Sequence, residues 1–353
     1  MITPSDKRYM QRALQLAHLG LGNTSPNPHV GAVIVADGRI IGEGSHRKVG
    51  EGHAEVNAIR SVRPEDRHLL SQSTMYVTLE PCSHYGKTPP CSLLIVETGI
   101  PRVVIASADP SPKVNGKGIA ILRNAGVEVE LMENEQTKEA DAENAPFRSP
   151  YVSHRPFITL KWAQSSDGFM AGENGEPVKF STPLSSTLVH KLRSEHDVIL
   201  TTSANVNNDN PRLDSRLWKA GRNPRIAVVD RYGKLNKDAQ ILNNEIPPLV
   251  YTESEISING AEMIVLKPCT PEAVLEDLMK RGYNSVLVEA GPTFLKTLID
   301  NQLYNAIRIE VSPLNIGKHG SKPAPIPTTT PTFCEKIESN HIYSLSQNGD
   351  KRI

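Results

Sequence analysis

Residues His53-Ala54-Glu55 are followed in the sequence by two Pro-Cys pairs, Pro81-Cys82 and Pro90-Cys91. A catalytic zinc site needs three protein ligands and leaves a fourth position for water, and one imidazole with two thiolates supplies that set. Glu55 then remains to move protons beside the metal. The nucleobase-deaminase signature is His-x-Glu followed by Pro-Cys-x-x-Cys, whereas residues 83–90 separate the cysteines here. The pattern therefore predicts a zinc-dependent deaminase with a longer loop between its cysteines.

The segments around this motif predict alternating helices and strands. Residues 54–62 are compatible with a helix, which would turn Glu55 toward the same water as His53. Residues 74–79 are rich in β-branched and aromatic side chains and predict a buried strand. We expect Cys82 at the start of the next element, where a helix N-terminus would favour its thiolate.

Other interpretations of these residues remain open. His46 or His84 could be a ligand, and a cysteine alone is often only a small buried hydrophobe. A purely structural zinc site is the main alternative for this segment. Such a site normally has a fourth protein ligand and would leave Glu55 without a role.

The length of the chain predicts two domains, and its charge balance predicts that it does not bind nucleic acid or membranes. The 353 residues exceed one ordinary domain, and 39 basic against 39 acidic side chains give no net charge. We therefore expect neither nucleic acid nor a membrane as a partner. No apolar run reaches the roughly 18 residues of a membrane span, and no signal-peptide pattern opens the chain. With two cysteines assigned to zinc, Cys269 and Cys334 are expected as free thiols in the cytoplasm.

Both halves alternate strands and helices, which predicts layered α/β domains with helices on the faces of each sheet. The boundary is expected between residues 148 and 149, with a linker near residues 147–155. In the first half the expected helices lie at residues 6–19, 53–62, 92–97, 117–125 and 133–145, with Ser5 as the first N-cap, and the strands at 30–35, 39–44, 74–79, 102–107 and 127–131. In the second half a strand from Pro156 turns at Asp167-Gly168, further strands are expected at 198–202, 225–229, 249–251, 263–265, 285–289 and 308–311, and helices at 187–195, 271–281 and 293–300.

The strongest local signal in the second half is a strand that ends at Glu289, turns at Gly291 and enters a helix at Thr293. Backbone N–H groups at such a helix start can hold a phosphate, but any strand–helix unit makes this turn. The half lacks the G-x-G-x-x-G turn of a Rossmann dinucleotide site.

The chain resembles the RibD family of bifunctional riboflavin-biosynthesis enzymes. In the first half the resemblance rests on Ser25–Gly31, Gly44–His46, Gly52–Glu55, Thr78–Cys91 and Asp109-Pro110 running to Gly116-Lys117-Gly118. In the second half it rests on Lys161…Ser165…Asp167-Gly168, Asp209–Leu213 and Val288–Leu295, and it thins out near Ile307. The resemblance implies a cytidine-deaminase-like three-layer α/β/α domain over residues 1–148 and a dihydrofolate-reductase-like α/β domain over residues 149–353.

The resemblance also implies two reactions on a small phosphoribosylated pyrimidine. The first is the Zn²⁺-dependent hydrolytic deamination of 2,5-diamino-6-(5-phosphoribosylamino)pyrimidin-4(3H)-one to 5-amino-6-(5-phosphoribosylamino)uracil. The second is the NADPH-dependent reduction of the ribosyl group to ribityl. For the deaminase it implies zinc ligands His53, Cys82 and Cys91, the proton carrier Glu55, and substrate-binding residues Asn27, His46, Lys87 and Asp109. For the reductase it implies NADPH contacts at Ala163, Phe180, Asn205, Asp209, Gly291, Pro292 and Thr293, and substrate contacts at Val178, Arg193, Leu213, Arg216 and Glu289.

Three positions depart from the family pattern. Phe180 stands where relatives usually have Trp and lacks the indole donor, and Asn205 stands where Thr is common. Both bear on NADPH affinity rather than on the fold. Ser111 replaces an Asn of many relatives, so we assign it no role.

Two alternative functions stay open at this point. In one, the second half has lost reduction and only binds a ligand or dimerises. In the other, the protein edits nucleic acid and the second half binds RNA, which the neutral charge and the lack of basic-aromatic clusters disfavour. NADPH oxidation by the second half would separate them. We also expect a homo-oligomer, whose subunit number the sequence does not give.

Overall fold

The computed structural model describes residues 2–86, 89–219, 222–327 and 330–346. The chain divides into two compact units, Met1–His154 and Arg155–Ile353. This division falls after the expected boundary, because a helix, α6 (Ala145–Val152), occupies most of the segment expected to be a linker. Among the described residues, no helix combines the length and the apolar character needed to cross a membrane.

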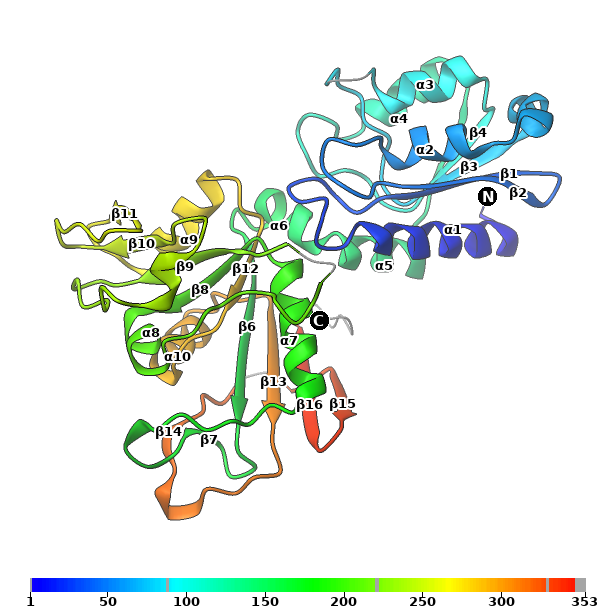
Figure 1. Ribbon diagram of the computed structural model, residues 1–353. Coiled ribbons are helices and arrows are strands. Elements are labelled where there is room, and N and C mark those ends of the chain that lie inside the picture. Colours follow the sequence, from blue (N-terminus) through cyan, green and yellow to red (C-terminus); the bar gives the residue numbers. More distant parts are fainter. Residues whose placement is uncertain (1, 87–88, 220–221, 328–329, 347–353) are drawn as a thin grey trace. The chain divides into compact units, whose positions relative to one another are not determined.

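The first unit is a five-stranded sheet between two layers of helices (Figure 1). The strands, in the order β2-β1-β3-β4-β5, are β2 (Arg39–Ser45), β1 (Gly31–Ala36), β3 (Thr74–Val77), β4 (Arg102–Ile105) and β5 (Glu128–Leu131). Strand β1 is antiparallel to β2 and β3, whereas β3, β4 and β5 are parallel. The helices are α1 (Pro4–Ala17), α2 (Ala54–Ser61), α3 (Cys91–Thr98), α4 (Lys117–Asn124), α5 (Glu135–Glu143) and α6, with 3₁₀ turns at His18–Gly20 and Pro64–Gln72.

Successive side chains of a strand point to opposite faces of the sheet, so apolar residues in a row bury both faces. Each face is therefore covered by its own layer of helices. Ile34 packs in the cluster that covers α2, α3 and α4, and Val33 packs in the cluster that covers α1 and α5. The β1–β2 hairpin turns at Asp37 and Gly38, both with positive φ, which such a tight turn requires. The expected three-layer α/β/α fold is confirmed, and the expected elements differ from the observed ones by at most two residues at each end.

One expected cap is wrong. Helix α1 begins at Pro4 and its N-cap is Thr3, not Ser5. The Thr3 hydroxyl accepts from the backbone N–H of Asp6, and the Asp6 carboxylate accepts from the backbone N–H of Thr3. This reciprocal pair, with a proline at the first helical position, stabilises the earlier start.

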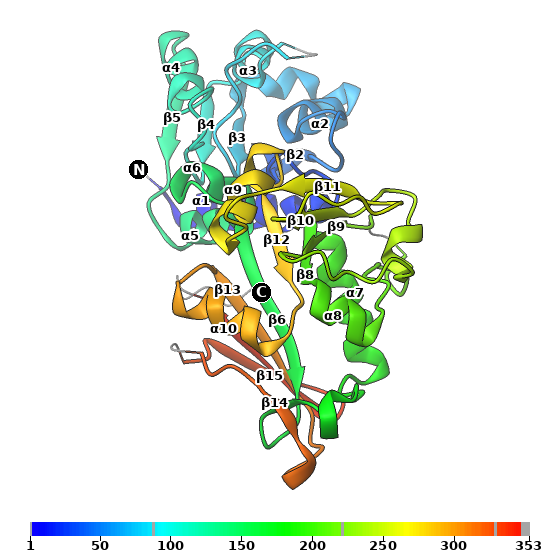
Figure 2. The same ribbon diagram turned by 90° about the vertical axis from the view of Figure 1, so that its left-hand side faces the viewer.

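The second unit is built on a nine-stranded sheet in the order β11-β10-β9-β8-β12-β6-β13-β16-β15 (Figures 1 and 2). Its strands are β6 (Phe157–Gln164), β8 (Val198–Thr202), β9 (Arg225–Val229), β10 (Leu249–Thr252), β11 (Glu262–Val265), β12 (Ser285–Val288), β13 (Ala306–Val311), β15 (Phe333–Ile337) and β16 (Asn340–Ser346). A separate ribbon pairs β7 (Phe169–Ala171) with β14 (Ser321–Pro323). The helices are α7 (Pro183–Glu195), α8 (Ser203–Asp209), α9 (Pro271–Lys280) and α10 (Pro292–Asp300), with 3₁₀ turns at Glu173–Gly175, Gln240–Asn243 and Gly317–His319.

The sheet of the second unit is parallel from β11 to β13, and β16 and β15 extend it as antiparallel strands. Helices α9 and α10 bury apolar side chains on one face, while α7 and α8 cover the other. Strands β15 and β16 lie after residue 311, where no strand was expected, and α7 begins four residues before its expected start. Thr182 caps α7 and Pro183 opens it, which moves its start forward.

Candidate active sites

The three predicted zinc ligands come together in the first unit. His53 is the N-cap of α2, Cys91 is the first residue of α3, and Cys82 lies in the loop after β3. The Nδ1 atom of His53 lies 3.6 Å from the Cys82 Sγ and 3.4 Å from the Cys91 Sγ. With Zn–S of about 2.3 Å and Zn–N of about 2.0 Å, a tetrahedral site separates sulfur and nitrogen by about 3.5 Å. The donor set therefore fits zinc in both chemistry and spacing.

The helix that supports the thiolates starts at Cys91 rather than at Cys82, contrary to the expectation from the sequence. Cys82 nevertheless faces this helix start, because its Sγ accepts from the backbone N–H of Cys91 at 3.2 Å. Hydrogen bonds from the Cys91 side chain and from His53 hold the pKa of Cys82 well below its usual range. Cys82 is thus held as a thiolate, the form that binds metals.

Glu55 is the second residue of α2 and is 4% exposed. Burial, and then the negative charge of Cys82, raise the pKa of Glu55 to about 7. A carboxyl group near this value can both take up and release a proton at neutral pH. Glu55 is not one of the three donors, so its role as the proton carrier stays a prediction.

Asn27 and His46 extend this site. The Asn27 side-chain amide lies 3.2 Å from the His46 Nε2, and the His46 Nδ1 lies 3.2 Å from the carbonyl oxygen of Gly52. Because a carbonyl can only accept, we place the His46 proton on Nδ1, and Nε2 accepts from Asn27. The ring of His46 packs edge-on against His53, with centroids 5.4 Å apart. Among the described residues, neither His46 nor His84 belongs to the group of donors that could hold a metal.

Asp109 is buried in the loop before α4. Its carboxylate accepts from the backbone N–H of Ser111 at 2.7 Å. Burial raises the pKa of Asp109 to about 6, and the charge of Glu80 adds to the effect. Lys87, the fourth residue predicted for this substrate pocket, lies outside the described residues.

In the second unit, most predicted NADPH contacts lie at the carboxyl ends of three neighbouring parallel strands. Asn205 and Asp209 are in α8 after β8, Gly291 to Thr293 follow β12, and Ala163 is near the end of β6. In open α/β sheets, ligands bind outside this edge. A Cβ on Gly291, the N-cap of α10, would meet nothing within 4 Å, so the turn leaves room for a cofactor. These residues fit a dinucleotide phosphate at the start of α10.

Phe180 and Val178 lie in the segment before α7. Phe180 is buried, 7% exposed, and its backbone oxygen accepts from the Asn340 side chain at 2.9 Å. Val178 is half-buried. A buried phenyl ring can still offer an apolar surface, so the replacement of Trp removes only the donor group.

The predicted substrate residues of the second unit form an ion-pair cluster. Arg193 donates to both carboxylate oxygens of Glu289, at 2.7 and 2.9 Å, and to the backbone oxygen of Asp214 at 3.0 Å. Burial opposes ionisation of Glu289, but the Arg193 charge outweighs it and lowers the pKa of Glu289 to about 2. Arg216 pairs with the Asp214 carboxylate. Leu213, adjacent to this pair, is buried with a φ of 50°, an uncommon conformation for a bulky residue.

Sequence reasoning assigned no role to three members of this cluster. Asp214 accepts from Arg216 and also pairs with Arg212 at 3.1 Å. The Nδ1 of His190 lies 3.9 Å from Asp214. Lys161 is half-buried, and the resulting loss of hydration lowers its pKa, while the charge of Glu289 raises it. Only Lys161 carried a signal, as the first residue of the Lys161–Gly168 pattern.

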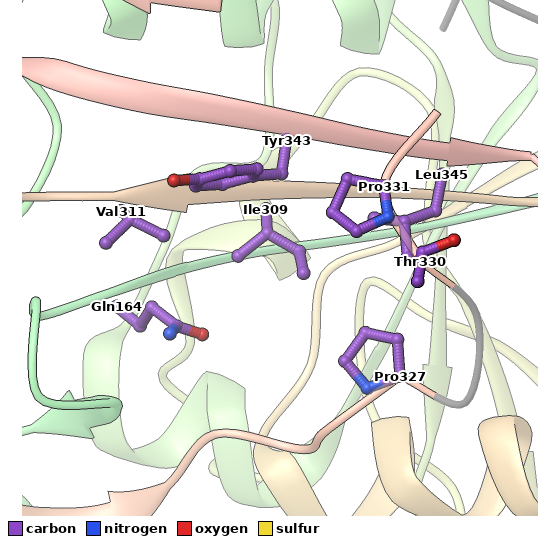
Figure 3. A pocket seen from close by; sticks show the side chains of 8 residues that line it. All are labelled: Gln164, Ile309, Val311, Pro327, Thr330, Pro331, Tyr343 and Leu345. Atoms are coloured by element: carbon purple, nitrogen blue, oxygen red, sulfur yellow. The ribbon is translucent and has the colours of Figure 1, made fainter. Parts of the chain in front are cut away.

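A separate pocket of about 360 Å³ lies in the second unit (Figure 3). Side chains of β6, β13 and β16 line it, together with the segment after β14. Its lining residues are Gln164, Ile309, Val311, Pro327, Thr330, Pro331, Tyr343 and Leu345. None of these is a predicted site residue, so the pocket and the ion-pair cluster are different features.

Both halves match known domain families. Residues 3–107 match the cytidine and deoxycytidylate deaminase zinc-binding region. Residues 156–347 match the RibD C-terminal domain. The second match, which spans most of the second unit, favours a reductase over the RNA-binding alternative.

Full-length relatives agree with the domain matches. Riboflavin biosynthesis protein RibD of Aquifex aeolicus is 36% identical over 325 residues, covering 90% of each chain. The Escherichia coli RibD is 34% identical over 348 residues, covering 88% of this chain and 89% of its own.

Solved structures show the same similarity. A diaminohydroxyphosphoribosylaminopyrimidine deaminase/5-amino-6-(5-phosphoribosylamino)uracil reductase from Thermotoga maritima has 36% identity and a TM-score of 0.87, over 97% of this chain and 98% of that one. RibD from Acinetobacter baumannii has 31% identity and a TM-score of 0.88 over the same shares. The chain therefore belongs to the RibD family of bifunctional deaminase–reductases of riboflavin biosynthesis.

Proposed function

We propose that the first unit removes an amino group from 2,5-diamino-6-(5-phosphoribosylamino)pyrimidin-4(3H)-one through His53, Cys82, Cys91 and Glu55. The observation that carries this proposal is the set of three donors at tetrahedral spacing beside a buried carboxyl group with a pKa of about 7. Zinc, when bound, lowers the pKa of a water molecule to about 7 and so supplies hydroxide at neutral pH. Glu55 would take one proton from the water and pass it to the ring nitrogen, and would then take the remaining hydroxyl proton and pass it to the departing amine, which leaves as ammonia as the C=O bond forms.

Asn27, His46 and Asp109 support the proposed binding of the pyrimidine. The donor and acceptor of the Asn27 amide suit the edge of a base, and His46 holds that amide through one ring nitrogen. The Asp109 carboxyl group is buried, so it loses little more hydration when a substrate amine approaches. Lys87 is kept in this proposal on the family resemblance alone.

We propose that the second unit then reduces the ribosyl group of 5-amino-6-(5-phosphoribosylamino)uracil to ribityl. NADPH supplies the hydride, which must reach the sugar C1 carbon. Gly291, Pro292 and Thr293 offer a helix start to a cofactor phosphate, and Ala163, Phe180, Asn205 and Asp209 line the same proposed cleft.

The ion-pair cluster suggests different roles for Arg193 and Arg216, the two arginines predicted to bind substrate. Arg193 is only 13% exposed and both its donor sides are taken by Glu289 and Asp214. Arg216 is 49% exposed. Arg216 is thus the better anchor for the substrate phosphate, while Arg193 orients Glu289 toward the sugar. Val178 and Leu213 complete the proposed substrate contacts.

Removal of the metal from the full-length enzyme tests both activities at once. Ammonia release from the diaminopyrimidine should stop after treatment with a chelator and return with added zinc. NADPH oxidation with pre-deaminated substrate should be unchanged throughout, because no residue of the second unit is assigned to the metal. If NADPH is not oxidised by the untreated enzyme, the alternative that the second unit has lost reduction is correct.

Two further proposals concern the whole molecule. We propose that the protein is a homo-oligomer and that it works in the cytoplasm, where the free thiols of Cys269 and Cys334 would stay reduced. Its mass in solution, measured by light scattering, tests the first. Fractionation of cells that produce the protein tests the second.

A further inference from the structure

Glu80 is a buried carboxylate, 3% exposed, that binds four backbone N–H groups. Its Oε1 accepts from Gly118 at 3.0 Å and from Ile119 at 3.2 Å. Its Oε2 accepts from Gly116 at 3.0 Å and from Asp109 at 3.4 Å. One side chain therefore connects the loop between β3 and the zinc ligand Cys82 with the Asp109 loop and with α4.

Three of the four N–H groups that bind Glu80 belong to a helix start. Gly116 is the N-cap of α4, and Gly118 and Ile119 belong to its first turn. Such groups attract an anion, because they lack partners within the helix and the helix dipole adds positive charge. Here the protein's own carboxylate fills the position, so this helix start holds the ligand loop and not a substrate phosphate.

A second contact ties α4 to the zinc-ligand turn. A Cβ on Gly118 would lie 2.0 Å from the backbone oxygen of Pro81, closer than any side chain allows. The helix and the Pro81-Cys82 turn therefore touch backbone to backbone. Glu80 joins the two segments by hydrogen bonds, and Gly118, which has no side chain, allows their backbones to touch.

We propose that Glu80 is a positioning residue of the deaminase, which fixes the substrate-binding loop at Asp109 relative to the zinc-ligand turn at Cys82. This inference rests on the proposed function, since Asp109 is a substrate contact only there. Glu80 touches neither the substrate nor the metal. Its effect should thus fall on substrate binding more than on the chemical step.

Steady-state kinetics of the zinc-loaded, full-length Glu80→Gln and Glu80→Ala enzymes test the inference. We expect the zinc content to stay normal and kcat/KM for ammonia release to fall by about 10- to 100-fold in Glu80→Ala, the loss of activity typical when a residue that supports a metal site is removed, with most of the change in KM. The value of kcat should change less. In Glu80→Gln the KM should rise less than in Glu80→Ala, since the amide oxygen can still accept from Gly118 and Ile119. NADPH oxidation by the same molecules should be unchanged.

Asp6→Asn is the matched control. Asp6 is another buried, hydrogen-bonded carboxylate of this unit, 2.7 Å from the Tyr76 hydroxyl and 2.9 Å from Arg102, on the α1 side of the sheet. Its replacement should lower stability and leave the deaminase KM unchanged. A KM within twofold of wild type in Glu80→Ala, or an equal rise in Asp6→Asn, overturns the inference alone. A wild-type enzyme that releases no ammonia overturns the proposed function and this inference with it.

Discussion

The two candidate active sites differ in how their charged groups are paired. In the first unit, three donor atoms lie within 4.8 Å of one another and converge on a point where a cation fits. In the second unit, Arg193 with Glu289 and Arg216 with Asp214 already satisfy each other. A substitution in the first site should therefore lower catalytic activity. A substitution in the second site should also lower stability, because it leaves a buried charge without its partner.

Loss of a zinc ligand should give the largest effect. Cys82→Ser and Cys91→Ser should lose zinc and all ammonia release, because a serine hydroxyl does not replace a thiolate ligand. Elemental analysis measures the zinc content, and an ammonia assay measures the deaminase activity. Cys269→Ser and Cys334→Ser are the controls and should keep the metal. If the first pair of variants retained stoichiometric zinc, the assignment of the metal site would be wrong.

Glu55→Gln should separate chemistry from metal binding in the first unit. Ammonia release should fall by about 10²- to 10⁴-fold, the typical contribution of a general acid/base, with the zinc content unchanged. NADPH oxidation with pre-deaminated substrate should remain normal. Glu51→Gln, an exposed neighbour outside the site, serves as the control. Zinc loss in Glu55→Gln would show that the carboxylate is a ligand after all.

Arg193→Ala should destabilise the second unit itself. Removing one partner of a buried ion pair costs about 3–5 kcal/mol, since Glu289 would keep its charge without a counter-ion. Urea unfolding measures this loss, and NADPH oxidation should fall with it. Lys191→Ala, on the same helix and paired with Glu195 at the surface, should cost about 0.5 kcal/mol or less. Equal losses of unfolding free energy in Arg193→Ala and Lys191→Ala would show that the buried ion pair of the second site has no special effect on stability.

Arg216→Ala should act on substrate affinity with a smaller effect. The KM for the phosphorylated substrate should rise by about 10-fold, as expected for one charge-assisted hydrogen bond. Arg231→Ala is the control, because Arg231 is an exposed arginine that pairs with Glu253. A KM for Arg216→Ala equal to that of wild type would take Arg216 out of the site.

The pH dependence of stability should have opposite signs in the two units. The pKa of Asp109 is raised to about 6, so the folded state loses stability relative to Asp109→Asn as pH rises from about 4 to 6. The pKa of Glu289 is lowered to about 2, so its contribution is complete above about pH 4.5 and is lost as pH falls toward 2. Unfolding measured against Asp109→Asn and Glu289→Gln tests both signs. The same sign for both residues would contradict the comparison.

The zinc site was predictable because its chemistry limits the residue types. Imidazole and thiolate donors in one short pattern have few other uses, and the structure brings His53, Cys82 and Cys91 together as expected. The helix start at Cys91 was not predictable in the same way. Residues 83–90 form no regular element among those described, so the sequence shows no period that marks where α3 begins.

The ion-pair cluster shows the limit of prediction from sequence. Arg193 and Glu289 are 96 positions apart and Arg193 reaches Asp214 across 21, so no local pattern reveals either pairing. The family resemblance pointed to Arg193 and Glu289 as separate substrate contacts and omitted Asp214. Strands β15 and β16 were missed for a similar reason, since their pairing to β13 depends on the whole sheet.

Each apolar cluster found among the described residues belongs to one unit. Every buried member of two clusters lies before residue 155, and every member of the other two lies after it. All three zinc donors are also encoded between residues 53 and 91. During synthesis on the ribosome, the amino-terminal unit has its whole core and its metal donors available before most of the reductase has been translated. Domains generally fold as units in this order, so the nascent chain can acquire its zinc first and its NADPH site later.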